Sequence, residues 1–186
     1  MNAPQPSKHA ILSPSAAYKW MPCPGSVALE RLSGNPDKPS KAASEGTFQH
    51  HVAAMCLEQR KPATDFLGHA ETVEGIDFVF DADHAATVQT YLDTVWNHVG
   101  DDGELFVEQA LDISWLTGEP GAIGTADAIV VRGGELIVID LKTGRNKVEA
   151  KNNHQLVIYS MAALKAYTEG KLQKCPPPVD SIDDLL

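Results

Sequence analysis

The sequence has few cysteines and no long apolar run. Its 186 residues include only three cysteines, Cys23, Cys56 and Cys175, which are odd in number and far apart along the chain. Such a set does not provide a disulfide framework. No stretch approaches the roughly 18 consecutive apolar residues of a membrane-spanning helix, and no charged segment followed by an apolar one opens the chain. We therefore expect a cytoplasmic protein without a membrane partner.

The composition is that of one folded domain. Hydrophobic residues make up 43% of the sequence, and a chain of this length can bury one sizeable core. We expect a flexible N-terminus over residues 1–12, a single domain over residues 13–174, and a flexible tail of acidic and apolar residues over 175–186.

Helical patterns precede the strands. The spacing of apolar residues predicts a helix over 42–59, a second helix that is capped by Asp83 and ends near Gly100, and a strand over 105–113. One stripe of the second helix is expected to be core: Val88, Leu92, Val95, Trp96 and Val99. Together with a further helix near the C-terminus, this order predicts the α/β class, with a central mixed β-sheet flanked by helices.

The most informative segment has the pattern of a β-hairpin. Two runs rich in β-branched residues, 128–132 and 135–140, are separated by the turn signal Gly133-Gly134. If the turn closes there, Asp127 faces Asp140. Apolar residues occupy both faces of the two runs, so we expect the hairpin to be buried in a covered sheet.

A metal ion is a natural reason for two carboxylates to face each other. Side chains opposed across a ladder have Cβ atoms about 4.5–5.5 Å apart, where like charges repel. Lys142 follows Asp140 by two residues and so lies on the same face of the strand. Acids at strand ends are often plain surface residues, but the pairing and the lysine favour a metal site suited to cutting phosphodiester bonds.

Four elements follow one another between residues 45 and 167. They are Gly46-x-x-x-His50, Gly124-x-x-Asp127, Asp140-Leu-Lys142-Thr-Gly144 and Gln155-x-x-x-Tyr159. Their order, and the gap of thirteen from Asp127 to Asp140, resemble the RecB-like branch of the PD-(D/E)XK nuclease superfamily. The resemblance implies a restriction-endonuclease-like core and a metal-dependent deoxyribonuclease, expected to be an exonuclease of phage or bacterial DNA recombination or repair.

The resemblance also implies a role for each matched residue. His50, Asp127 and Asp140 would bind Mg²⁺ or Mn²⁺, with the backbone carbonyl of Leu141 as a further ligand. Such oxygen-rich ligand sets suit these ions. Lys142 would hold or polarise the attacking water and stabilise the charge that develops on the phosphate. Lys142, Asp127 and Asp140 are thus the expected catalytic residues.

Gln155 and Tyr159 are four residues apart on a predicted helix, which is capped by Asn152 or Asn153 and stops near Gly170. In the resembled branch, this pair lies beside the active site and contacts the substrate or orients the lysine. The alternative is that Tyr159 is an ordinary core residue.

Other candidates lie close to these motifs in the sequence. Glu45 precedes His50 by five residues. It could contact the metal ligands without binding the metal itself, or it could simply favour the start of the helix. Glu108 lies on the expected early strand and could approach the metal. His51 adjoins His50, and side chains about 100° apart on a helix cannot both bind one ion, so the motif selects His50.

Some relatives in the resembled branch hold an iron–sulfur cluster on four cysteines, three of them after the last motif. Here only Cys175 follows the helix of Gln155 and Tyr159. We therefore expect no iron–sulfur cluster in a single chain.

Acidic residues outnumber basic ones by 25 to 15, which gives a net charge of −10. This charge opposes DNA binding, because phosphate backbones favour Lys and Arg. Eight of the fifteen basic residues lie between Arg132 and Lys174, however, so a local basic face can coexist with overall acidity. We expect DNA to bind weakly to a single subunit, which a homo-oligomer or a recombination or single-strand-binding partner protein would assist.

Two alternatives stay open. The chain could be a catalytically weak module that keeps a nuclease fold for DNA binding or regulation, or a metal protein whose hairpin acids hold a structural ion. Lys142 argues against the structural ion, since such a cation gains nothing from a neighbouring ammonium.

Overall fold

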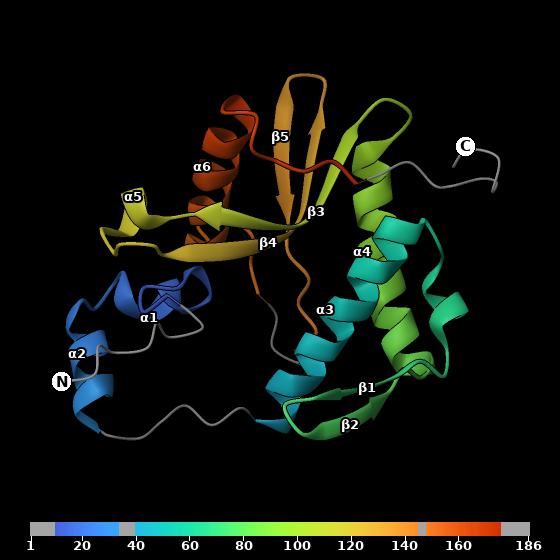
Figure 1. Cartoon of the computed structure of the whole chain (residues 1–186), viewed down its shortest axis with the longest axis horizontal. Helices are drawn as coiled ribbons and strands as arrows, with labels where there is room; N and C mark the ends of the chain where they lie inside the picture. Colours follow the sequence, from blue (N-terminus) through green and yellow to red (C-terminus); the bar gives the residue numbers. More distant parts are fainter. Residues whose placement is uncertain (1–9, 34–39, 145–147, 176–186) are drawn as a thin grey trace.

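A three-stranded antiparallel sheet with helices on both faces forms the centre of the molecule (Figure 1). The computed structural model describes residues 10–33, 40–144 and 148–175. The sheet has the order β3-β4-β5, with β3 Glu104–Asp112, β4 Ile123–Arg132 and β5 Glu135–Ile139. A separate hairpin pairs β1 Ala70–Val73 with β2 Ile76–Val79.

The α/β class with flanking helices is confirmed, but the expected mixed sheet is wrong. Every pairing among the described strands is antiparallel. The connections explain this, because only ten residues join β3 to β4 and only two join β4 to β5. A parallel pair needs a crossover of about a dozen or more residues.

Helices surround this sheet in the order that the sequence indicates. They are η1 Pro14–Ala16, α1 Ala17–Trp20, α2 Gly25–Ser33, α3 Lys41–Gln59, η2 Ala63–Phe66, α4 Ala82–Val99, α5 Ser114–Thr117 and α6 His154–Thr168. The cap of α4 is Asp81 and not Asp83, because Asp81 and His84 form a reciprocal capping box. The predicted cap Asn153 is confirmed, since its side chain accepts the Leu156 amide. Among the described residues, no helix is long and apolar enough to cross a bilayer.

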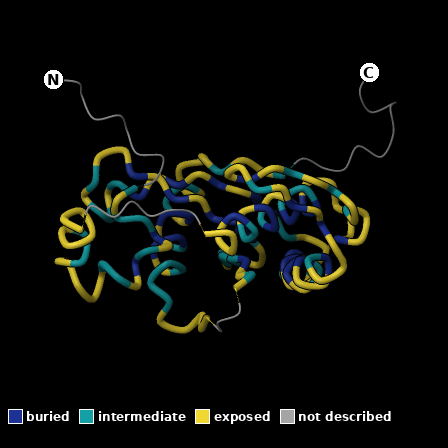
Figure 2. Tube along the Cα trace, turned by 90° about the horizontal axis from the view of Figure 1, so that it is seen from below, coloured by how far each residue is buried: buried dark blue, intermediate teal, exposed yellow. Residues whose placement is uncertain are grey.

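The sheet separates two apolar cores. The first lies against α3, α4 and the β1-β2 hairpin and contains Phe48, Leu92 and Val130. The second lies against η1, α1 and α6 and contains Ile129 and Ile158. Buried segments run through the interior and exposed ones along the outside (Figure 2). The predicted stripe of α4 is confirmed as core, with Trp96 only partly buried.

The strands β3 and β4 change the face that they present near Glu108. Leu105 and Val107 pack in the first core, but Leu111, an even number of residues further on, packs in the second. Glu108 has a φ of 48°, a left-handed conformation that is uncommon outside glycine. The neighbouring pairs Val107–Ala128 and Gln109–Ala126 place Asp127 opposite Glu108. Both acids therefore lie at the point where the strands change face.

The segment that precedes α1 is hydrogen-bonded to the loop that leads into β4. The amides of Ile11 and Leu12 both donate to the Glu119 carboxylate at 2.9 Å, so these two residues of the expected flexible N-terminus are held in place, and residues 1–9 lie outside the described part. At the other end, the Cys175 amide donates to the Leu105 carbonyl at 3.0 Å. The rest of the predicted tail, 176–186, lies outside the described residues.

Gly124 lets this segment approach α6. A Cβ at Gly124 would lie 2.9 Å from Pro14 Cγ and 2.9 Å from Tyr159 Cε1. Since real Cβ atoms do not come so close to other atoms, the absence of a side chain is what allows Pro14 to pack there.

We expect Gly124→Ala to lower the free energy of unfolding by about 1–3 kcal/mol, as overpacking of a filled core does. Gly25→Ala is the matched control, because a Cβ at Gly25 meets no atom within 4 Å. Urea denaturation of both variants measures the difference. Equal stability of the two variants would contradict this close packing of η1 on β4 and α6.

Candidate functional site

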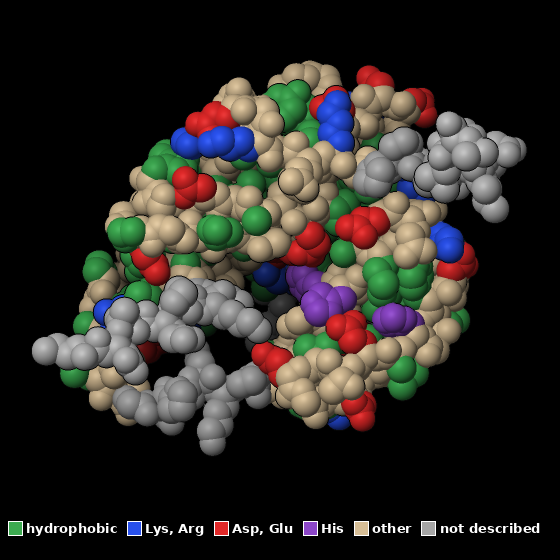
Figure 3. All heavy atoms as spheres, in the orientation of Figure 1, with side chains coloured by type: hydrophobic (Ala, Val, Ile, Leu, Met, Phe, Trp, Pro, Cys, Tyr) green, Lys and Arg blue, Asp and Glu red, His purple; other side chains and the backbone are tan. Residues whose placement is uncertain are grey.

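Three potential metal ligands from three elements converge at the point where β3 and β4 change face. His50 comes from α3, Glu108 from β3 and Asp127 from β4, and one ligand atom of each lies within 4.8 Å of the others. His50 Nδ1 is 3.3 Å from Asp127 Oδ1. Histidine and acidic side chains gather beside a hollow in the middle of this face of the molecule (Figure 3). This group could hold a metal ion.

The charges of this group perturb one another. Burial of the carboxyl and the charge of Asp127 raise the pKa of Glu108 to about 7, although water still reaches part of that side chain. Burial alone would lower the pKa of His50, but its hydrogen bond to Asp127 and the surrounding carboxylates outweigh burial and raise it. Burial and Asp127 also raise the pKa of Asp140, against the effect of Lys142. A divalent cation would relieve this repulsion between carboxylates.

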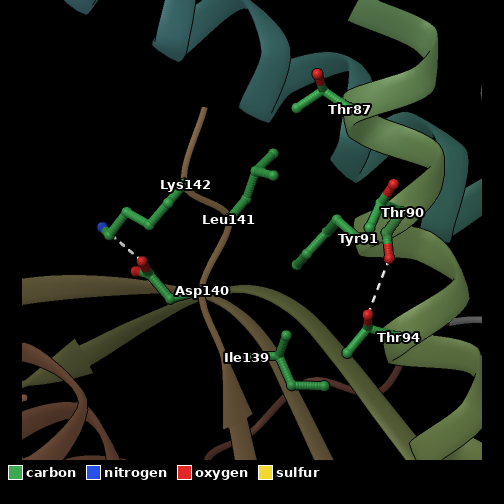
Figure 4. A pocket seen from close by; sticks show the side chains of 8 residues that line it. All are labelled: Thr87, Thr90, Tyr91, Thr94, Ile139, Asp140, Leu141 and Lys142. Carbon is green, nitrogen blue, oxygen red and sulfur yellow. Dashed lines mark hydrogen bonds and ion pairs between the residues drawn. The ribbon is translucent and has the colours of Figure 1, made fainter. Parts of the chain in front are cut away.

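Asp140, Lys142 and Gln155 form a closed set of polar contacts beside the three ligands. Lys142 Nζ lies 2.5 Å from Asp140 Oδ2 and donates to Gln155 Oε1 at 3.0 Å. Gln155 Nε2 donates to Asp140 Oδ1 at 2.9 Å. Asp140 and Lys142 point to the same side of the chain and Leu141 points to the opposite side (Figure 4), as the sequence predicts. Both oxygens of Asp140 are thus engaged, and Asp140 is not one of the three clustered ligands.

The end of β5 positions these residues. The predicted hairpin register is confirmed as far as the pair Ala128–Ile139. Beyond it the chain leaves the ladder, and the Leu141 amide donates instead to Asp127 Oδ2 at 2.7 Å. The Leu141 side chain, 5% exposed, packs in the first core. This anchor on both sides fixes Asp140 and Lys142 next to Asp127, and the Leu141 carbonyl remains a predicted ligand.

Two other candidates of the sequence have partners of their own. Glu45 Oε1 lies 3.1 Å from His84 Nε2, and His51 Nδ1 lies 2.8 Å from Glu71 Oε1. The choice of His50 over His51 is therefore supported by the side chains that each one meets. Glu45 interacts with the start of α4, and its contact is not with the three ligands.

Tyr159 is a core residue that also touches the site. It is 5% exposed and packs in the second core. Burial raises the pKa of its phenol, against the effect of a hydrogen bond with Gln155. Both interpretations of the sequence thus apply in part, because Tyr159 packs in the core and meets the glutamine that holds Lys142.

Two cavities adjoin the site on opposite sides of residues 139–142. One, of about 370 Å³, lies against the threonines of α4 and is lined by Thr87, Thr90, Tyr91, Thr94, Ile139, Asp140, Leu141 and Lys142 (Figure 4). The other, of about 500 Å³, includes Lys142, Gln155 and Tyr18. Sequence reasoning missed both, although threonines at helical spacing on α4 were a signal for the first.

We predict that Glu108→Gln stabilises the protein in EDTA above pH 7 and not at pH 4.5. A carboxyl whose folded pKa is raised contributes stability below its ordinary pKa and loses it as the pH rises through the folded value, here from 4.5 to about 7. The expected gain is about 1–2 kcal/mol, less than the full shift because water reaches this side chain. Thermal unfolding across this range measures it, and a gain that is constant with pH would contradict the charge argument.

Comparison with known proteins identifies a family and no structural neighbour. No solved structure gives a significant match to the chain. Residues 9–170, which include every candidate site residue, match the family model described as protein of unknown function (DUF2800). This match extends over most of the 186 residues, and the chain therefore belongs to the DUF2800 family.

Proposed function

We propose that the chain is a divalent-metal-dependent deoxyribonuclease that hydrolyses phosphodiester bonds. One observation carries the proposal: His50, Glu108 and Asp127 converge, and Asp140, whose carboxyl interacts electrostatically with Asp127 and His50, holds the ammonium of Lys142. The resemblance of the ordered motifs to the RecB-like nucleases supports a restriction-endonuclease-like core. The same resemblance favours an exonuclease of DNA recombination or repair, in the cytoplasm of a bacterial or phage-infected cell.

The ligand set fits Mg²⁺ or Mn²⁺. Two carboxylates and one imidazole lie close together, and burial, with a further contribution from the charge of Asp127, raises the pKa of Glu108. Asp140 and the Leu141 carbonyl, directly after β5, are proposed as additional oxygen donors. When bound, such an ion would polarise a phosphoryl oxygen and lower the pKa of a coordinated water.

The residues around the ion supply charge and orientation. Lys142 is held by Asp140 and Gln155 at 2.5 Å and 3.0 Å, so its ammonium is directed before the substrate arrives. On binding, we propose that this ammonium turns to the scissile phosphate, where negative charge grows in the transition state. Asp140 would then be free to serve as a further metal ligand. Gln155 keeps both groups within reach, which makes it a positioning residue.

The ammonium separates this proposal from a structural metal site. A second positive charge nearby would weaken the binding of a cation that only stabilised the fold. A structural metal site therefore gives no reason for a lysine at position 142. Lys142 is 41% exposed and lines both cavities, so it is accessible to a phosphate.

Mn²⁺ is expected to raise the melting temperature of the wild-type protein and of His51→Ala, but not of His50→Ala. At a metal concentration of 100 times the Kd, binding stabilises the folded state by about 2.7 kcal/mol. His51 is the matched control because it lies next to His50 and pairs with Glu71. Equal shifts in all three proteins would mean that the metal binds elsewhere.

The Lys142→Ala variant should cleave end-labelled linear DNA about 10²- to 10³-fold more slowly than the wild type in Mg²⁺ or Mn²⁺, the usual loss for one group that stabilises transition-state charge. Lys171→Ala, which removes an exposed lysine paired with Glu169, should cleave normally. EDTA should stop cleavage, and circular DNA should survive if the protein is an exonuclease.

The same cleavage assay can also reject the nuclease proposal. If wild-type protein and Lys142→Ala bind DNA equally and neither cleaves it in any metal, the chain is a nuclease-fold module for DNA binding or regulation and not an enzyme.

A further inference from the structure

The cavity of about 500 Å³ next to Lys142 combines catalytic and aromatic side chains. Its lining includes Lys142 and Gln155 from the site, Tyr18 from α1, and Asn152 and His154 at the start of α6. Because Lys142 and Gln155 belong to both the cavity and the site, a substrate whose phosphate meets Lys142 has its neighbouring atoms in this cavity. Ligand pockets commonly have volumes of about 300–1,000 Å³, so the space suits one nucleotide.

The aromatic ring in this cavity is not used for packing. Tyr18 is 66% exposed, whereas Tyr91 and Tyr159 are 7% and 5% exposed. Tyr167 is also partly covered, since its ring meets Phe106 edge-on. An exposed ring beside a catalytic lysine therefore calls for an explanation other than the hydrophobic core.

The backbone that carries the ring is nevertheless held in place. Ala17, the residue before Tyr18, is fully buried in the second core with Tyr159. Trp20 Nε1 donates to the Ser13 carbonyl at 2.9 Å and closes the turn around α1. Lys19 Nζ lies 5.7 Å from the centre of the Tyr18 ring. A residue on an anchored backbone loses less freedom when a ligand binds than one on a mobile loop, which favours recognition.

The cavity on the other side of residues 139–142 also contains Lys142, but its aromatic residue, Tyr91, is only 7% exposed and packs in the first core. Its wall is formed by Thr87, Thr90 and Thr94, and each of their hydroxyls donates to a carbonyl of its own helix. These groups offer methyls and acceptor oxygens and therefore attract neither a phosphate nor a base face strongly. The observations favour the Tyr18 side as the place where the substrate is recognised.

We propose that Tyr18 stacks on an unpaired base next to the scissile phosphate and so determines specificity for single-stranded DNA. The proposal rests on the nuclease function proposed above. A base in a duplex has both faces covered by its neighbours, whereas an unpaired base can place one face on a tyrosine ring. Such stacking tolerates any base, because every base has a π-face. The ring selects the state of the strand and not its sequence.

The first test follows a fluorescent base. An oligonucleotide with 2-aminopurine near its end is titrated with protein in EDTA, so that binding is read without hydrolysis. We expect quenching of the 2-aminopurine by wild-type protein and by Tyr18→Phe, which keeps the ring, and no quenching by Tyr18→Ala. Trp115→Ala is the matched control, because Trp115 is an exposed aromatic residue (46%) outside the lining of this cavity. Unchanged quenching in Tyr18→Ala would overturn the proposal.

The second test compares cleavage of single strands and blunt duplexes. For Tyr18→Ala we expect kcat/KM on the single strand to fall about 5- to 100-fold, the range that corresponds to loss of one stacked base, with the duplex unaffected. An abasic nucleotide at the stacked position should slow the wild type to a similar extent and slow Tyr18→Ala no further. Equal losses on both substrates, or additive effects of the abasic nucleotide and the variant, would overturn stacking.

The results distinguish failure of the Tyr18 proposal from failure of the nuclease proposal. If the wild-type protein cleaves no DNA, the nuclease function is rejected, and the 2-aminopurine signal still decides about Tyr18. If the wild type cleaves but Tyr18→Ala behaves like the wild type in both tests, only the role of Tyr18 is rejected. Tyr18→Ala should melt at the wild-type temperature, since the side chain is largely exposed.

Discussion

Glu108 and Asp127 oppose each other where β3 and β4 change the face that they present, and the site depends on this constraint. A regular strand pair would have directed both carboxylates to the face of Phe106 and Ile129, in the second core and away from α3. The left-handed backbone of Glu108, with a φ of 48°, brings both acids to the end of the shorter strand β5. His50 meets them there. Backbone strain of this kind is often found at functional sites, and here it coincides with mutual repulsion of acids.

Charge is balanced unevenly around this centre. Asp140 has its own ammonium and amide, because Lys142 and Gln155 contact both of its oxygens. Glu108 and Asp127 lie close to His50, and burial together with the charge of Asp127 raises the pKa of Glu108 to about 7. The site is thus divided into a neutralised part and a part with excess negative charge. A cation would be drawn to the part with excess negative charge.

The hairpin and its neighbours could be predicted from the sequence because local rules determine them. The turn at Gly133-Gly134 fixed the register that carries Asp127, and the motif order singled out His50 and Lys142. For Glu108 the sequence indicates only that the side chain could approach the metal, since nothing in an apolar run predicts a glutamate with a left-handed backbone. The β1-β2 hairpin was missed because its turn, Glu74-Gly75, is not one of the usual turn pairs. The hydrogen bond from Gln155 to Asp140 depends on how α6 packs against the sheet, which no local sequence pattern records.

The segment before α1 is attached to the rest of the chain through the Glu119 carboxylate, which accepts the amides of Ile11 and Leu12. Tyr18, in α1, and the candidate site residues thus belong to separate parts of the sequence that meet only in the fold. Such a division allows evolution to exchange one part while the other stays constant. Under the proposed function, differences among family members in the first twenty or so residues would alter which DNA strands are recognised, while the metal-binding residues stay the same.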